Sequence, residues 1–270
     1  MTSRERILAA IHHRPVDRVP IDFGGTRQSG IAAIAYAKLR HHLGIPGPPP
    51  KVFDLFQMLA EIEPAVADRF GSDCVFLNRP AVAFGIENTG WKPFALFDGT
   101  AVLVPDGFNP ESDARGDLIL RRGDEIIARM PKNGFYFDRL EKFPGALHPD
   151  LDSWEPPRLS DYDLQHYATE ARRAFEQTDK AVIAALAPPY ELFNGIGQGD
   201  FEAWMITFAT EPEYVERLYA ILTDAWLENL AALHPAVGDR IQILQLADEF
   251  GTHTAPFLSP PMFLEPLTPA

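Results

Sequence analysis

The pattern of hydrophobic and polar positions predicts a chain in which helices alternate with short buried strands. Apolar residues recur at three- and four-residue spacing in the helical stretches, and short apolar runs separate these stretches. The first helix is predicted to begin after Thr2, because Thr2 and Glu5 have the spacing of a capping box. Further helices are predicted over residues 30–43 and 54–70, and after Ser160, Asp200, Thr210 and Ser259.

Four short segments are predicted to be strands of a parallel sheet. Residues 19–23 alternate between apolar and polar or proline positions, which is typical of a strand. Residues 74–77 and 181–187 are apolar runs, which favour strands buried on both faces, and residues 241–247 are predicted to be the fourth strand. Helices between these strands predict an α/β fold of the (β/α)8 TIM-barrel type. About four of the eight barrel strands are accounted for, so we expect an incomplete barrel in a C-terminally truncated chain.

Residues 85–145 break this pattern, because glycine, proline and aspartate are frequent there. Short apolar runs alternate with turn sequences such as Asp98-Gly99 and Gly123-Asp124, which favour antiparallel hairpins. We therefore predict the first βα units of the barrel at residues 1–84, an inserted β-rich subdomain or flap at 85–145, and further βα units at 146–270.

Net charge, apolar runs and cysteine content limit the classes of function and the compartments to be considered. The chain has 270 residues, of which 24 are Lys or Arg and 38 are Asp or Glu, so its formal net charge is −14. This acidic excess argues against a nucleic-acid partner and against an anionic membrane, since both require clustered cations. The sequence lacks a run of roughly 18 apolar residues and the apolar core of a signal peptide. With Cys74 as its single cysteine, we expect a cytoplasmic protein without a disulfide framework or an internal metal site.

Candidate functional residues follow from the geometry of barrels, in which reactive groups lie at the rim where the strands end. Arg27 follows the first predicted strand, Asn194 follows the third, and Asp248 and Glu249 follow the fourth, while Asp73 opens the second. Carboxylates that converge at a rim can act as general acids, general bases or metal ligands. A single acidic residue near a strand end is more often a turn residue or a helix cap.

Several segments resemble the uroporphyrinogen decarboxylase superfamily, in the right order and across essentially the whole chain. They are Arg14-Pro15-Val16-Asp17-Arg18-Val19-Pro20, Arg69-Phe70-Gly71-Ser72-Asp73, Gly199-Asp200-Phe201-Glu202-Ala203-Trp204, Asp248-Glu249-Phe250-Gly251-Thr252 and Leu258-Ser259-Pro260-Pro261-Met262-Phe263. The resemblance implies a (β/α)8 barrel. It also implies one of two activities, which are tetrapyrrole decarboxylation in haem biosynthesis and methyl transfer linked to a corrinoid.

The decarboxylase motif is half present. Decarboxylases of the family clamp the acidic side chains of the tetrapyrrole with the two arginines of an Arg-Gln-Ala-Gly-Arg segment. Here Arg27 matches the first arginine, but Ile31 stands at the position of the second. An alkyl side chain cannot replace the charge-assisted hydrogen bonds of a guanidinium. The resemblance also places Asp73 at the central catalytic aspartate of the family, and Asn194 roughly at the position of its tyrosine.

The methyltransferase branch is favoured by the insertion, whose end at residues 128–134 is similar to that of methyltransferase-like members. For this branch the resemblance implies zinc, held by a His-x-Cys pair and a later cysteine, and a corrinoid protein as partner. We expect these zinc ligands beyond Ala270 and none within this chain.

We therefore expect a corrinoid-linked methyltransferase-type barrel with a small-molecule substrate. In this interpretation Asp73 is catalytic, and Arg27, Asn194, Asp248 and Glu249 bind substrate. The alternatives are a uroporphyrinogen III decarboxylase and an inactive fragment. Half a barrel exposes sheet edges, so an oligomer or a second, completing chain is a further expectation.

Overall fold

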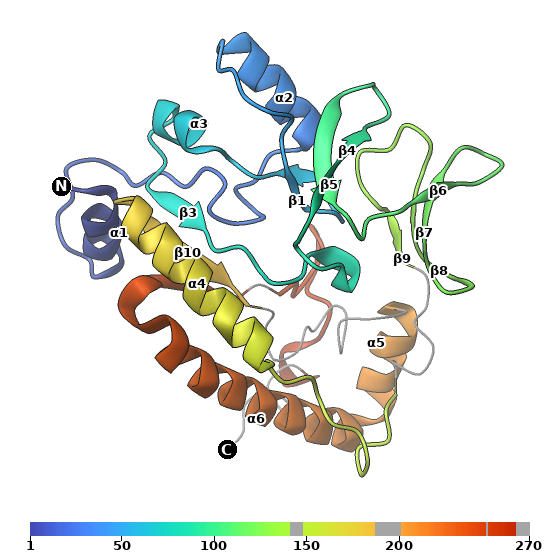
Figure 1. The fold of residues 1–270 in the computed structure, drawn as a ribbon. Helices are drawn as coiled ribbons and strands as arrows, with labels where there is room; N and C mark the ends of the chain where they lie inside the picture. Colours follow the sequence, from blue (N-terminus) through green and yellow to red (C-terminus); the bar gives the residue numbers. More distant parts are fainter. Residues whose placement is uncertain (141–147, 187–200, 247, 263–270) are drawn as a thin grey trace. The chain divides into compact units, whose positions relative to one another are not determined.

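The computed structural model describes residues 1–140, 148–186, 201–246 and 248–262 of a mixed α/β chain (Figure 1). The chain divides into two compact units. The first comprises Met1–Arg139, Asp161–Ala185 and Ala236–Gln245, and the second comprises Leu140–Ser160, Leu186–Pro235 and Leu246–Ala270. Within the described ranges there are several small sheets and no closed barrel.

A three-stranded parallel sheet forms part of the first unit. Its strands are β3 (Cys74–Phe76), β10 (Ala181–Ala185) and β11 (Ile243–Gln245), with β10 in the middle. All five residues of β10 are buried, as its continuous apolar sequence predicts. The register aligns Ile183 with a residue of each neighbouring strand. Three of the four predicted strands are therefore confirmed, and they run in the same direction.

Two helices contact β10. They are α1 (Ser3–Ile11) and α4 (Asp161–Gln177). The predicted capping box begins α1, since the Thr2 side chain accepts a hydrogen bond from the Glu5 amide over 3.2 Å. In return, the Glu5 carboxylate accepts one from the Thr2 amide over 2.8 Å. Ile7 of α1 is buried against β3 and β10, so the cap positions an apolar side chain on the sheet.

The prediction of a strand over residues 19–23 is wrong. The segment is not part of any described sheet, and the Val19 side chain is 79% exposed. Pro20 has no amide hydrogen to donate to a ladder. The segment contacts the parallel sheet at the start of β3, where the Asp73 amide donates to the Ile21 carbonyl over 2.7 Å.

The prediction of one helix over residues 54–70 is also wrong. The antiparallel hairpin of β1 (Val52–Asp54) and β2 (Leu59–Ala60) comes first, and the short helix α3 (Pro64–Arg69) follows. Burial extends along most of the hairpin, which is not the one-sided pattern of a surface helix. The Asp54 carboxylate closes the turn by accepting a backbone hydrogen bond over 2.7 Å. Proline in its first turn sets the start of α3.

The helix predicted over residues 30–43 is confirmed as α2 (Ala33–His42). Its last turn carries Arg40, His41 and His42, whose charge or polarity complements the helix C-terminus. Gly44 follows with φ of 64°, a left-handed conformation that glycine adopts without a side-chain clash.

Antiparallel hairpins make up the insertion, as predicted. β4 (Trp91–Ala95) pairs with β5 (Ala101–Pro105) across the Asp98-Gly99 turn. A four-stranded sheet follows, consisting of β6 (Glu111–Ser112), β7 (Leu118–Arg122), β8 (Glu125–Met130) and β9 (Arg139–Leu140). Two short 3-10 turns complete the first unit, η1 (Ala83–Gly85) and η2 (Gly238–Arg240).

In the second unit, the helices predicted after Asp200 and Thr210 are confirmed as α5 (Phe201–Thr210) and α6 (Pro212–Val237), of which α6 belongs to this unit up to Pro235. They bury a shared apolar core of Leu151, Trp204, Phe208, Val215, Leu218, Tyr219, Leu222 and Leu258. Most of the helix predicted after Ser259 lies outside the described residues. Among the described residues, none of the helices has the length and apolar character that a membrane crossing requires.

Candidate functional site at the carboxyl edge of the parallel sheet

Polar side chains gather in the first unit where the parallel strands end. Asn78 and Arg79 follow β3, and Gln245 is the last residue of β11. The Gln245 amide donates to the Gln28 side-chain oxygen over 2.9 Å, which places the loop that contains Arg27 beside this edge. Arg27 therefore lies at the strand ends, the position from which its role in substrate binding was inferred.

A cavity of about 110 Å³, which we call the Arg27 cavity, lies at the end of β3 and is lined there by Phe76, Asn78 and Arg79. Phe53 and Phe76 provide its apolar wall, with ring centroids 5.0 Å apart. The other lining residues are Arg27, Asp54, Asn78, Arg79, Ala81, Val82, Ala83 and Asn88. Pockets that enclose drug-sized ligands have roughly 300–1,000 Å³, so the Arg27 cavity fits one acidic arm of a molecule rather than a large ligand.

Arg27 is held by a buried carboxylate. Its Nε atom lies 2.5 Å from the Asp54 Oδ2 atom, and the exposed fractions of the two side chains are 37% and 8%. The N–H is not aligned for a hydrogen bond with that oxygen, and the Nε atom has no other hydrogen-bond partner among the described residues. Asp54 thus fixes the position of the cation mainly through charge. A guanidinium has several further N–H donors, which suit the two oxygens of an incoming carboxylate.

Asn88 adds a hydrogen-bond acceptor. Its side-chain nitrogen donates to the Arg79 carbonyl over 3.0 Å, which orients the amide. Its Oδ1 atom is buried and has no hydrogen-bond partner among the described residues. An unsatisfied buried acceptor costs about 1–3 kcal/mol, which a donor on a ligand or a water molecule offsets. His166 of α4 also reaches this edge, because its Nε2 atom lies 3.1 Å from the Asn78 carbonyl.

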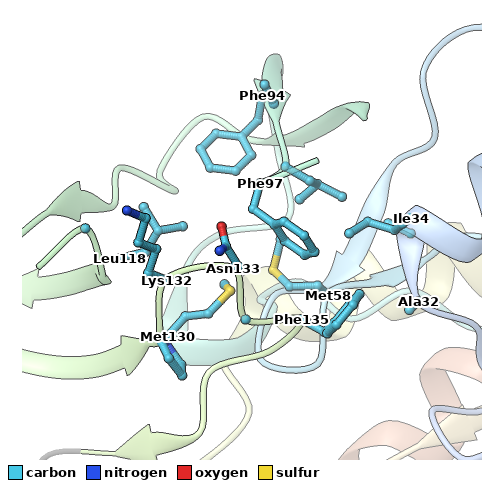
Figure 2. Close-up of a pocket in the computed structure, with 16 residues that line it drawn as sticks. Ala32, Ile34, Met58, Phe94, Phe97, Leu118, Met130, Lys132, Asn133 and Phe135 are labelled. Carbon is cyan, nitrogen blue, oxygen red and sulfur yellow. The ribbon is translucent and has the colours of Figure 1, made fainter. Parts of the chain in front are cut away.

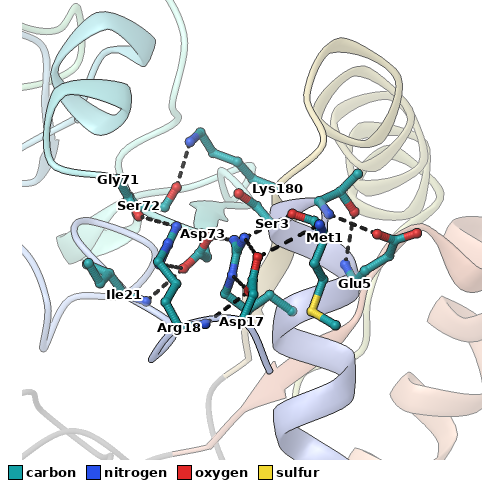
Figure 3. A network of polar contacts seen from close by, with 12 residues as sticks. Met1, Ser3, Glu5, Asp17, Arg18, Ile21, Gly71, Ser72, Asp73 and Lys180 are labelled. Atoms are coloured by element: carbon teal, nitrogen blue, oxygen red, sulfur yellow. Dashed lines mark hydrogen bonds and ion pairs between the residues drawn. The ribbon is translucent and has the colours of Figure 1, made fainter. Parts of the chain in front are cut away.

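Asp73 lies at the opposite edge, immediately before β3, and its side chain is fully buried (Figure 3). The carboxylate accepts hydrogen bonds from Arg6 over 2.6 Å, from Arg18 over 2.7 and 2.8 Å, and from the Ile21 amide over 2.9 Å. Burial by itself raises the pKa of Asp73. The hydrogen bonds from Arg18 and Ile21 outweigh that effect, so the pKa lies below its ordinary value.

These contacts are those of a structural cluster. Asp17 contacts the same Arg6 guanidinium, with 2.6 Å between Oδ1 and Nε. The cluster thereby connects α1, the segment after it and the start of β3. The contacts of Asp73 are thus structural, and the catalytic role predicted for it stays a prediction.

The remaining predicted residues are Asp248, Glu249 and Asn194. Asp248 and Glu249 belong to the second unit, where the Asp248 carboxylate accepts a hydrogen bond from the Glu249 amide over 2.8 Å. Asn194 lies outside the described residues. In the described part of the chain, Arg27 is thus the predicted site residue that lines the cavity.

Sequence reasoning missed several polar residues of this edge, Asn88 among them. Asn78 and Arg79 directly follow a strand that was predicted, so the rule that located Arg27 would also have found them. Asp54 was hidden because its segment was assigned to a helix. His166 lies inside a helix, and its contact at Asn78 is 88 residues away in the chain, so it has no local signal.

The described residues do not provide a site that fits the zinc implied by the methyltransferase resemblance. Within the described ranges, no three or more His, Cys, Asp or Glu side chains are grouped to hold a metal ion. The Cys74 side chain is buried, and that burial raises the pKa of its thiol to about 12. It therefore remains a thiol at neutral pH, whereas zinc binds the thiolate.

A scan against protein-family models finds no match for this sequence, and a search of curated proteins finds no similar protein. The superfamily resemblance accordingly rests on the sequence segments alone.

Proposed function

We propose that the chain belongs to a barrel enzyme of the uroporphyrinogen decarboxylase superfamily, of the corrinoid-linked methyltransferase type. Its carboxyl edge then holds the anionic group of a small-molecule substrate. The observation that supports this most is the cavity lined by both Arg27 and Arg79 at the carboxyl end of the parallel strand β3. Ligands of α/β proteins with parallel strands bind at this edge. In this proposal β3, β10 and β11 are successive strands of a (β/α)8 barrel.

The role of this chain is to bind and orient. Arg27, fixed by Asp54, pairs with the substrate anion, and the Asn88 oxygen accepts a hydrogen bond from a donor on the substrate. A corrinoid supplies a transferable methyl group when it is bound. Positioning the acceptor by one charged contact and one hydrogen bond favours such a transfer, because alignment removes much of the entropic cost of bringing two reactants together.

The methyltransferase type is preferred over the decarboxylase for two reasons. The insertion, whose end is similar to that of methyltransferase-like members, consists of antiparallel hairpins in the described structure. In addition, Ile31 stands where a decarboxylase has its second clamping arginine, and its backbone carbonyl is engaged by the Ala60 amide over 2.9 Å.

Tetrapyrrole decarboxylation is the second candidate. It is favoured by the presence of a second arginine in the lining of the Arg27 cavity. Arg79 lines the same cavity as Arg27, so a second guanidinium is present despite Ile31. Two cations in a small cavity suit one acidic arm of a polycarboxylate.

The two candidates are separated by parallel assays on the 270-residue protein. We expect protein-dependent loss of methylcobalamin absorbance with 3-mercaptopropionate, a thiol that carries a carboxylate, as methyl acceptor, and a rate reduced roughly tenfold or more in Arg27→Gln. The matched control is Arg115→Gln, a 72% exposed arginine in the insertion, which should leave the rate unchanged. Conversion of uroporphyrinogen to coproporphyrinogen instead would favour the second candidate. A folded protein that does neither would contradict both.

A further inference from the structure

A second and larger cavity, of about 270 Å³, lies elsewhere in the first unit (Figure 2). It is bounded by the start of α2, the β1–β2 turn, the β4–β5 turn and the loop after β8. It shares no lining residue with the Arg27 cavity. A ligand bound here is therefore additional to the substrate proposed above, and we call this space the insertion cavity.

The insertion cavity has an aromatic mouth. The Phe97 and Phe135 rings meet edge to face, with centroids 5.0 Å apart and an interplanar angle of 87°. Their side chains are 47% and 54% exposed. Exposing large apolar rings to water is unfavourable at roughly 25 cal/mol per Å², so a molecule that covers both rings gains that free energy. Phe94, Met58 and Met130 extend the apolar wall inward.

Burial and backbone hydrogen bonds hold this wall in place. Met58 and Met130 are buried, with 3% and 5% exposure. The Ala33 amide donates to the Met58 carbonyl over 2.9 Å, which joins α2 to the β1–β2 turn. The Lys132 amide donates to the Asp117 carboxylate over 2.9 Å, which fixes the loop after β8. Binding therefore requires little ordering of the chain, which favours affinity for a small ligand.

The polar groups of the insertion cavity are a cation and an amide. Lys132 and Asn133 line it, and none of its lining residues is acidic. Among the described residues the Lys132 ammonium has no ion-pair partner, although the whole chain carries a net charge of −14. Asn133 has φ of 62°, so the backbone turns in a left-handed conformation at the cavity. An ammonium beside apolar walls selects a ligand with an anionic head.

We propose that the insertion cavity binds a small aromatic carboxylate. The ring system covers Phe97 and Phe135, and the carboxylate pairs with Lys132 and accepts a hydrogen bond from the Asn133 amide. The volume limits the ligand to about two fused rings, since it lies just below the range of drug-sized pockets.

Isothermal titration calorimetry with 2-naphthoate as probe tests this, with uncharged 2-naphthalenemethanol as its comparison. We expect Lys132→Met to weaken naphthoate binding roughly tenfold and to leave naphthalenemethanol binding unchanged, because one charge-assisted hydrogen bond is lost. Phe97→Ala should weaken both ligands. The matched control is Lys38→Met, because Lys38 is 70% exposed and lies outside the cavity lining. Lys132→Arg should keep most of the affinity for naphthoate.

Lys132 is exposed, so its replacement should leave the thermal unfolding midpoint within error of the unmodified protein. Equal naphthoate affinity of Lys132→Met and the unmodified protein would overturn the proposal. Failure of the unmodified protein to bind 2-naphthoate at millimolar concentration would overturn it as well. Neither result would affect the methyl-transfer assay, which depends on Arg27.

Discussion

The two edges of the parallel sheet both carry charged residues, but they differ in how those charges are satisfied. At the N-terminal edge, Asp73 accepts hydrogen bonds from two arginines and a backbone amide over 2.6–2.9 Å. At the carboxyl edge, Arg27 contacts Asp54 through a poorly aligned nitrogen, and the Asn88 oxygen has no partner within the described residues. The first edge is closed by its own contacts, while the second retains capacity for a ligand. Hydrogen-bond saturation, rather than charge or burial alone, distinguishes a structural cluster from a binding site.

The largest change in the free energy of unfolding is expected for a substitution at the N-terminal edge. Asp73→Asn should lower the free energy of unfolding by about 3–5 kcal/mol, because it leaves Arg6 and Arg18 without their shared buried carboxylate. Urea unfolding at neutral pH measures this. The control is Asp22→Asn at an exposed carboxylate, for which a much smaller loss is expected. A loss below 1 kcal/mol for Asp73→Asn would show that the cluster does not hold the edge together.

Lowering the pH should reduce the stability that the Asp73 cluster gives to the folded protein. Hydrogen bonds from Arg6 hold the pKa of Asp17 below its ordinary value, and the pKa of Asp73 is lowered as well. A depressed pKa in the folded state stabilises it above the unfolded pKa of about 4, and this stabilisation is lost as pH falls through the folded value. The unfolding free energy should therefore decrease below about pH 4, and less steeply in Asp73→Asn. Parallel pH profiles for the two proteins would refute the assignment.

The contrast between the edges was only partly predictable from the sequence. The α1 cap and the apolar run of β10 carry local signals, so both elements were predicted, and the strand-end rule located Arg27. Tertiary burial overrode the helical pattern in residues 54–70, and Pro20 prevented strand pairing in residues 19–23. Asp54 and His166 join the site through contacts between segments distant in the chain, which periodicity does not encode.

A smaller effect on stability is expected at the open edge. Arg27→Gln should change the free energy of unfolding by no more than about 1 kcal/mol, because its side chain is 37% exposed and glutamine can still donate to Asp54. The methyl-transfer rate should nevertheless fall. A loss of stability as large as that of Asp73→Asn would show that Arg27 has a structural role, like the residues around Asp73.

The smallest effect is expected for the hydrogen bond between Gln28 and Gln245. The contact is exposed, so Gln28→Ala should alter the unfolding free energy by less than about 0.5 kcal/mol. Thermal melts of the variant and the unmodified protein should nearly coincide. A clear drop in the melting midpoint would mean that this contact holds the loop of Arg27 in place.

The most direct measurement is calorimetric binding of succinate, a small dicarboxylate, to the unmodified protein and to two arginine variants. Arg27 and Arg18 have similar exposed fractions, 37% and 40%, and lie at opposite edges of the sheet. The account predicts that Arg27→Gln binds succinate at least roughly tenfold more weakly, while Arg18→Gln binds it normally and is only less stable. Unchanged binding in Arg27→Gln, an equal loss in Arg18→Gln, or no binding by the unmodified protein would contradict it.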